Sequence, residues 1–199
     1  MLFQGVKRRF TNGKYFKLFA LIVVQILSPT ELVLVKMVQV PRERLNAFKD
    51  KKVLKDIEER GDVRLKLNEQ VLEIEGEGDK EFFAEQVVKA ICLGFDARKA
   101  FKLFKEDFYL EIIDLELACR RSAKAVERAK SRIIGSEGKC KRILQELSDA
   151  DISVWGDKVA LIGRYEEIQD AREAITRLLE GAQHSSVYKF LEGRKRMRD

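Results

Sequence analysis

"RIIGSEGKCKRILQELSDADISVWGDKVALIG", residues 132–163, is the stretch that decides the fold. Gly135 and Gly138 form a G-x-x-G turn, and the apolar residues after it recur at three- and four-residue spacing, which predicts a helix. The segment 151–156 then alternates between apolar and polar residues, and 158–164 follows directly after two turn residues, which predicts a β-hairpin. The stretch therefore predicts a helix, a glycine turn, a second helix and two paired strands.

The same order of elements occurs earlier in the chain. A gap-free shift of 87 residues places 52–78 over 139–165, with mostly apolar residues facing apolar ones. In each copy an amphipathic helix follows the hairpin, and one more strand precedes the pair of helices. We therefore predict an α+β protein with two copies of the order strand–helix–helix–strand–strand–helix (βααββα). Each copy would be a three-stranded sheet covered on one face by three helices.

The predicted elements divide the chain into an N-terminal extension (1–35), a first domain (36–107) and a second domain (108–199). The predicted strands are 36–40, 63–67, 70–76, 108–117, 151–156 and 158–164. The predicted helices are 42–48, 53–60, 79–95, 119–130, 140–147 and 165–182.

The N-terminal extension combines a basic cluster with a short apolar run at 16–27. The run has 12 residues, whereas a membrane-spanning helix needs about 20. Three interpretations fit: a signal-peptide-like segment, a weakly packed extension, or a stretch upstream of a true translation start at Met37. We favour the last two and expect a cytoplasmic protein with no membrane contact. The three cysteines, which are odd in number and widely spaced, indicate a reducing compartment and neither a disulfide framework nor a zinc site.

The positive charge is concentrated in one segment. Between Arg120 and Arg142 there are nine basic residues against two acidic ones, within a chain of net charge +6. The segment contains the glycine turn. A local basic patch of this kind indicates nucleic-acid binding more strongly than a high overall charge does, although a solvated helix face gives the same pattern.

Two nucleotide-binding motifs are excluded. A P-loop, G-x-x-x-x-G-K-[ST], that ended at Gly138 and Lys139 would need a glycine and a hydroxyl residue where the chain has Ile133 and Cys140. A dinucleotide fingerprint needs a third glycine and a strand before the turn. The turn here joins two predicted helices. Its glycines let the backbone approach a ligand where a Cβ would clash, and the helix from Lys139 offers amide groups and a partial positive charge to phosphates.

Residues 130–181 resemble a type I KH domain, in which a G-x-x-G turn within βααββα clamps single-stranded nucleic acid. The flanking stretches "EDFYLEIIDLE" (106–116) and "HSSVYKFLE" (184–192) resemble the partner-of-Nob (Dim-type) family of small-subunit ribosome assembly factors. The resemblance covers roughly 36–192. It implies two tandem type I KH domains, binding to single-stranded rRNA near the 3′ end of the small-subunit rRNA, and the Nob-type endonuclease and pre-ribosomal or translation-factor proteins as partners.

The expected RNA site is a groove for about four bases between the turn and the strand 151–156. No catalytic residue, metal site or cofactor is expected. The predicted RNA-binding residues are the turn, the basic residues around it and the groove walls: Arg128, Lys130, Arg132, Ile133, Ile134, Gly135, Ser136, Glu137, Gly138, Lys139, Lys141, Arg142, Leu144, Ile152, Ser153 and Val154.

Several features depart from the KH pattern. The first copy has no glycine at the turn position, 48–51, so we expect it not to clamp RNA. Glu137 should repel a phosphate, so affinity would depend on its basic neighbours. The helix 119–130 is interpreted as an extension of the first helix of its domain that adds salt-dependent backbone contacts. Lys141 either contacts a phosphate or extends into solvent, and the basic tail 192–199 either binds RNA or is frayed.

Two other functions compete with RNA binding. An enzyme is disfavoured because the chain has a single histidine and no hydrolase, metalloprotease or Cys/His motif. A protein–protein scaffold or translation-associated adaptor with little RNA affinity remains the alternative, and it would leave the basic patch without a ligand.

Overall fold

The computed structural model describes residues 34–120 and 122–198, and almost all of the predicted extension 1–35 lies outside them. The described chain contains two three-stranded antiparallel sheets, and each sheet packs with the helices of its own half of the chain. The α+β class is confirmed. We call residues 34–104 the first unit and residues 109–198 the second unit.

The first unit has the strand order β1-β3-β2. Its β1 begins upstream of Met37 and pairs along its whole length with β3. The elements are β1 (Leu34–Gln39), η1 (Arg42–Arg44), α2 (Leu45–Lys49), α3 (Lys51–Gly61), β2 (Arg64–Asn68), β3 (Val71–Gly76), α4 (Lys80–Cys92), α5 (Ala97–Ala100) and η2 (Phe101–Phe104).

The second unit has the corresponding strand order β4-β6-β5. The elements are β4 (Tyr109–Asp114), α6 (Leu115–Ala118), α7 (Ala123–Ile134), η3 (Ser136–Gly138), α8 (Lys139–Ser148), β5 (Asp151–Trp155), β6 (Lys158–Gly163), α9 (Tyr165–Leu179) and α10 (His184–Arg198).

The two units repeat at the shift predicted from the sequence. The bounds of β2 and β3 coincide with those of β5 and β6 after a shift of 87 residues. Side-chain contacts repeat too: Glu58 Oε1 accepts a hydrogen bond from the Leu65 amide, and Gln145 Oε1 accepts one from the Ile152 amide, both at 2.9 Å. The shared shift therefore reflects equivalent structure and not only a shared apolar pattern.

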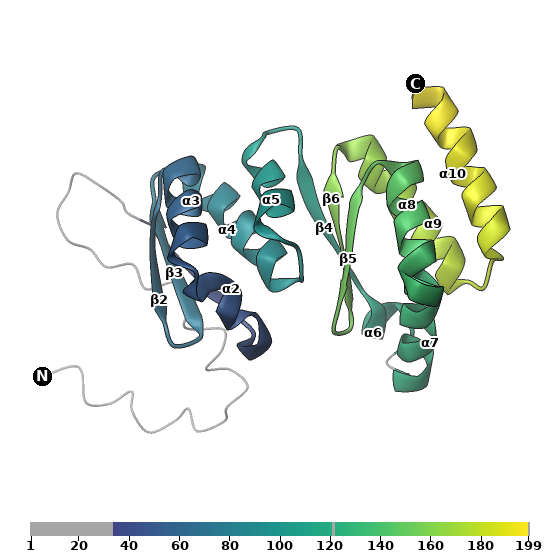
Figure 1. Cartoon of the computed structure of the whole chain (residues 1–199), viewed down its shortest axis with the longest axis horizontal. Coiled ribbons are helices and arrows are strands. Elements are labelled where there is room, and N and C mark those ends of the chain that lie inside the picture. The colour runs from purple at the N-terminus through teal and green to yellow at the C-terminus, as the bar shows by residue number, and fades with distance from the viewer. Residues whose placement is uncertain (1–33, 121, 199) are drawn as a thin grey trace, which may run out of the picture.

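Sheets and helices alternate along the long axis of the molecule (Figure 1). The helices of the first unit pack on the face of the second sheet that α8 and α9 leave uncovered, so Ala160 and Ile162 of β6 belong to the hydrophobic core of the first unit. Ser153 Oγ donates a hydrogen bond to the Leu93 carbonyl at 2.8 Å across this contact. The second sheet is thus covered on both faces, whereas the prediction covered only one.

The junction between β4 and α7 differs from the prediction. The predicted strand 108–117 ends at Asp114, whose carboxylate accepts a hydrogen bond from the Leu117 amide at 3.0 Å and starts α6. The predicted helix 119–130 begins only at Ala123, after its N-cap Ser122. Arg121 lies outside the described residues.

The C-terminal tail is a docked helix, which corrects the expectation of fraying. Helix α10 buries Val187 and Leu191 against the second core. Asp170, only 2% exposed, pairs with Arg194 at 2.6 Å and with Arg198. These basic side chains are therefore committed to holding α10 on α9. No helix among the described residues is long and apolar enough to cross a bilayer.

Candidate nucleic-acid interface

The two glycines of the turn have different structural tasks. Gly135 has φ 71° and ψ 177°, and a Cβ there would lie 2.6 Å from the Cβ and 2.8 Å from the backbone nitrogen of Cys140. Gly135 is therefore required for the close approach of α7 to α8. Gly138 has φ 74°, but a Cβ there would meet nothing within 4 Å among the described residues. Gly138 consequently sets the backbone turn and leaves its outer surface open.

The N-terminus of α8 is open to an external anion. Its N-cap is Gly138, and no side chain in the described part of the chain accepts a hydrogen bond from its first amides. In the first unit the equivalent position is closed, because the Asp50 carboxylate accepts from the Lys52 amide at 2.9 Å and caps α3. The Lys139 amide donates to the Ser136 carbonyl, but no side chain of the described residues caps α8. Of this pair of helices, only α8 can therefore present an uncapped, positive helix end to a phosphate.

The basic residues around the turn fall into two groups. Arg128, Lys139 and Arg142 are exposed and extend from α7 and α8. Lys130 is less exposed and pairs with Glu127 on the same helix at 3.3 Å. The exposed group supplies charge that a ligand can reach.

Arg132 does not belong to the exposed group, which corrects its prediction as a phosphate contact. Its guanidinium donates to the Leu178 carbonyl at 3.1 Å and to the Ala182 carbonyl at 2.5 Å, at the end of α9. In the first unit Arg44 makes the same pair of bonds at the end of α4, at 2.9 and 3.0 Å. The first unit has no glycine turn but keeps the same arginine–carbonyl bonds, so Arg132 has a structural role in joining α7 to the end of α9.

The predicted groove walls separate into core and surface. Ile133, Leu144 and Ile152 are at most 2% exposed and form part of the second hydrophobic core. Only Ile134 and Val154 of the predicted walls reach the surface in part. They lie at the end of α7 and on the edge strand β5.

Ser153 points to the other face of the sheet, because side chains alternate along a strand. It is 6% exposed and bonded to the first unit. The prediction of Ser153 as a groove residue is therefore wrong.

Lys141 lies in the first turn of α8 and is half-buried. Burial lowers the pKa of its ammonium group, and the nearby charge of Lys99 lowers this pKa further, while Asp151 opposes the shift. Lys141 thus lies beside a charged cluster at the contact between the two units, and it does not simply extend into solvent.

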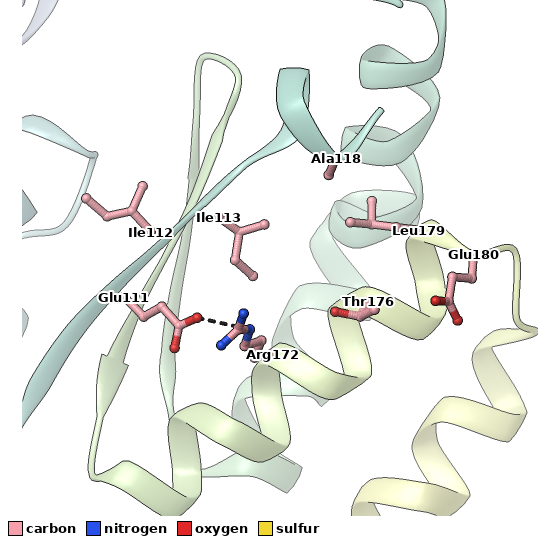
Figure 2. Close-up of a pocket in the computed structure, with 8 residues that line it drawn as sticks. All are labelled: Glu111, Ile112, Ile113, Ala118, Arg172, Thr176, Leu179 and Glu180. Atoms are coloured by element: carbon pink, nitrogen blue, oxygen red, sulfur yellow. Dashed lines mark ion pairs between the residues drawn. The ribbon is translucent and has the colours of Figure 1, made fainter. Parts of the chain in front are cut away.

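Sequence reasoning missed a cavity of about 330 Å³ between β4, α6 and α9, whose lining is drawn in Figure 2. Glu111 and Arg172 face one another across it with a separation of 3.2 Å between Oε1 and Nε. The large apolar side chains Tyr109, Ile112 and Leu117 are exposed on β4 and α6. The sequence did contain a sign of this surface, because the stretch 108–117 has more apolar residues than one buried face of a strand requires.

Thiol and metal chemistry has little support in the described residues. Burial raises the pKa of the Cys92 thiol to about 11, and burial also raises the pKa of Cys140. No group of three or more His, Cys, Asp or Glu side chains within residues 34–120 and 122–198 is arranged to hold a metal ion. His184 is half-buried, with Nε2 3.0 Å from the Arg132 carbonyl.

Comparison with known proteins places the second unit in a KH family. A model of the PNO1-type KH domain, described as "Eukaryotic type KH-domain (KH-domain type I)", matches residues 109–196. A KH domain-containing protein of Methanocaldococcus jannaschii is 36% identical over 166 residues, which are 79% of this chain and 73% of that protein. The pre-rRNA-processing protein pno1 of Aspergillus fumigatus is 32% identical over 106 residues, 52% of this chain and 42% of that protein.

Among solved structures, a chain in the crystal structure of an a/eIF2alpha–aDim2p–rRNA complex from Pyrococcus horikoshii has a TM-score of 0.77 to this protein. It is 33% identical in sequence, and the match covers 84% of this chain and 97% of that one. The protein therefore belongs to the Dim2p and PNO1 family of KH-domain ribosome assembly factors.

Proposed function

We propose that this protein binds single-stranded rRNA near the 3′ end of the small-subunit rRNA during ribosome biogenesis, as a binding protein and not as an enzyme. The observation that carries the proposal is the uncapped N-terminus of α8 behind the open side of Gly138, beside exposed basic residues. The match of this unit to a KH family supports it, as do relatives named for pre-rRNA processing and a structural neighbour found with rRNA.

In the second unit, separate groups of residues would bind the phosphates and the bases of the RNA. A phosphate would lie at the first amides of α8, and Lys139 and Arg142 would add positive charge around it. Bases would pass over Ile134 and Val154, the two predicted wall residues that reach the surface. Glu137, which is exposed beside the phosphate position, would reduce affinity. The site therefore comprises the turn, its basic neighbours and a short apolar edge.

We further propose that the two units are tandem type I KH domains, with boundaries near 36–107 and 108–199, and that the first is degenerate. Its Asp50 carboxylate occupies the helix end that a phosphate would otherwise take. The Nob-type endonuclease and pre-ribosomal or translation-factor proteins are the proposed protein partners in the cytoplasm. A neighbouring structure that contains a/eIF2alpha supports the translation-factor class.

A protein-docking role is favoured by one separate observation. Strand β4 lies at an edge of its sheet, next to the exposed side chains of Tyr109, Ile112 and Leu117 and the cavity in Figure 2. Edge strands with nearby apolar surface are common sites of protein binding. This surface is distinct from the glycine turn, so the protein could bind RNA and a partner at once.

Fluorescence anisotropy with a labelled oligonucleotide from the 3′ end of the small-subunit rRNA tests the proposed function. We expect binding that weakens as salt rises, and weaker binding to an oligonucleotide of scrambled sequence. Ser136→Asp adds a negative charge at an exposed position of the turn and should reduce affinity about tenfold or more. Lys49→Gln, at the turn of the first unit, lowers the net charge by the same one unit, so it is the matched control and should change little. Salt-insensitive or undetectable binding by the unaltered protein would refute the proposal.

A further inference from the structure

Two lysines of the first unit pair with one carboxylate of the second at the contact between the units, and a third lysine lies in the first turn of α8. Asp151 is the first residue of β5, the edge strand beside the proposed groove. Lys99 of α5 reaches its Oδ1 at 2.8 Å, and Lys102 of η2 reaches its Oδ2 at 2.7 Å. Lys141, in the first turn of α8, is close enough for Lys99 and Asp151 both to influence its pKa. The cluster therefore joins four elements, α5 and η2 of the first unit and α8 and β5 of the second.

The cluster carries an excess of positive charge. Asp151 has one carboxylate for three ammonium groups, and its side chain is only 13% exposed. Lys99 and Lys102 keep about 40% of their side chains exposed while they hold that carboxylate. Lys141 makes no ion pair within 4 Å in the described part of the chain. A charge excess held in place by the packing of two units is a pre-organised site for an anion.

The position of the cluster relates it to the glycine turn. Lys141 is three residues after Gly138, and Asp151 starts β5, the strand on the far side of the proposed groove. An RNA strand clamped at the turn and lying along β5 would pass these lysines with its next phosphates. The first unit, which lacks a glycine turn of its own, would then touch the same RNA through α5 and η2.

We propose that Lys99 and Lys102 of the first unit, together with Lys141 of the second, form a composite phosphate site that extends the RNA path beyond the G-x-x-G turn. The inference rests on the proposed function, since it assumes RNA at the turn. It gives the first unit a direct role in binding and explains how a clamp that contains Glu137 can hold RNA.

Two variants separate RNA contact from a purely structural role. Lys99→Gln combined with Lys102→Gln, and Asp151→Asn alone, both break the same inter-unit ion pairs. The first lowers the local positive charge and the second raises it. If the lysines contact phosphates, the two variants must change RNA affinity in opposite directions, whereas a structural role alone would move both in the same direction.

The test uses the full chain and two single-stranded oligonucleotides, of about four and about twelve nucleotides, in anisotropy titrations at several salt concentrations. We expect the lysine variant to bind the longer oligonucleotide on the order of tenfold more weakly at 0.1 M salt, with a salt slope smaller by about 1.4. Asp151→Asn should bind the longer oligonucleotide more tightly, and neither variant should change binding of the shorter one. Lys52→Gln with Lys55→Gln, on exposed positions of α3, removes the same charge as a control.

Unchanged binding of the longer oligonucleotide, or weaker binding by both variants, would overturn the composite site and leave the glycine clamp intact. Absence of salt-sensitive binding of either oligonucleotide by the unaltered protein would overturn the proposed function, and the composite site with it.

Discussion

The two glycines of the turn should separate stability from RNA binding when each is replaced by alanine. Gly135→Ala places a Cβ 2.6 Å from Cys140 in a backbone conformation that is nearly restricted to glycine. Backbone strain of about 1–3 kcal/mol and overpacking of about 1–3 kcal/mol give an expected destabilisation of roughly 2–6 kcal/mol. Gly138→Ala meets open space, so only the cost of a left-handed residue applies, about 1–2 kcal/mol.

The effect on RNA affinity should follow the opposite order, with the larger loss in Gly138→Ala, the variant that destabilises the fold less. The Cβ of Gly138→Ala lies on the open side of the turn, where the RNA backbone is proposed to approach, so this variant should stay folded and lose most of its binding. Urea unfolding gives the two free energies of unfolding, and anisotropy titration of the folded variants gives the affinities. Equal destabilisation by the two variants would refute the packing argument. Unchanged RNA affinity of Gly138→Ala would refute the role of the open surface.

Three further predictions follow from individual side chains. Asp170→Asn should lower the free energy of unfolding by about 2–4 kcal/mol in urea titration, because it leaves the arginines of α10 without their buried partner. Glu173→Gln, in an exposed pair with Arg177, is the control and should lower the free energy of unfolding by less than about 0.5 kcal/mol. Glu137→Gln should bind RNA about two- to fivefold more tightly at low salt, with a gain that shrinks as salt rises, and a gain independent of salt would contradict the electrostatic cause. Burial raises the pKa of Asp151, but the ammonium groups of Lys102 and Lys99 lower it below 3.8 on balance. The ionised carboxylate should therefore stabilise the fold above pH 3.8, and this stabilisation should be lost as the pH falls below that value. The acid unfolding curve of Asp151→Asn should lack this pH-dependent loss of stability.

The strands of the two hairpins could be predicted from sequence to within a residue or two, because their pattern is local. The alternation of Leu65 and Leu67 with polar residues fixes which face of β2 packs on the core, and the turn residues fix where the hairpin reverses. The shift of 87 residues then placed the same elements in the second unit. Local periodicity and repetition were sufficient for this part of the fold.

The contact between the units was missed because it depends on residues that are far apart in the chain. One signal was present: β6 has four consecutive apolar residues, 159–162, whereas the equivalent strand β3 alternates with Glu73 and Glu75. A continuous apolar run indicates a strand that is buried on both faces. Interpreted in this way, β6 would have predicted that another layer covers the second sheet.

The candidate site was predicted in outline but not in detail. The position of the turn and the helix after it follow from the spacing of Gly135 and Gly138. The spacing could not show that Arg132 is occupied by the carbonyls at the end of α9, because those carbonyls are 46 and 50 residues away in sequence. The same limit applies to the tail, where the partner that holds α10 is the distant Asp170.

Ultraviolet crosslinking of the full chain to a single-stranded oligonucleotide from the 3′ end of the small-subunit rRNA, followed by mass spectrometry of the linked peptides, tests the central claim most directly. The account predicts crosslinks concentrated in residues 134–142 and along β5, with further crosslinks in α5 and η2. Crosslinks concentrated on the first sheet or on the exposed side of β4, with none at the turn, would contradict it.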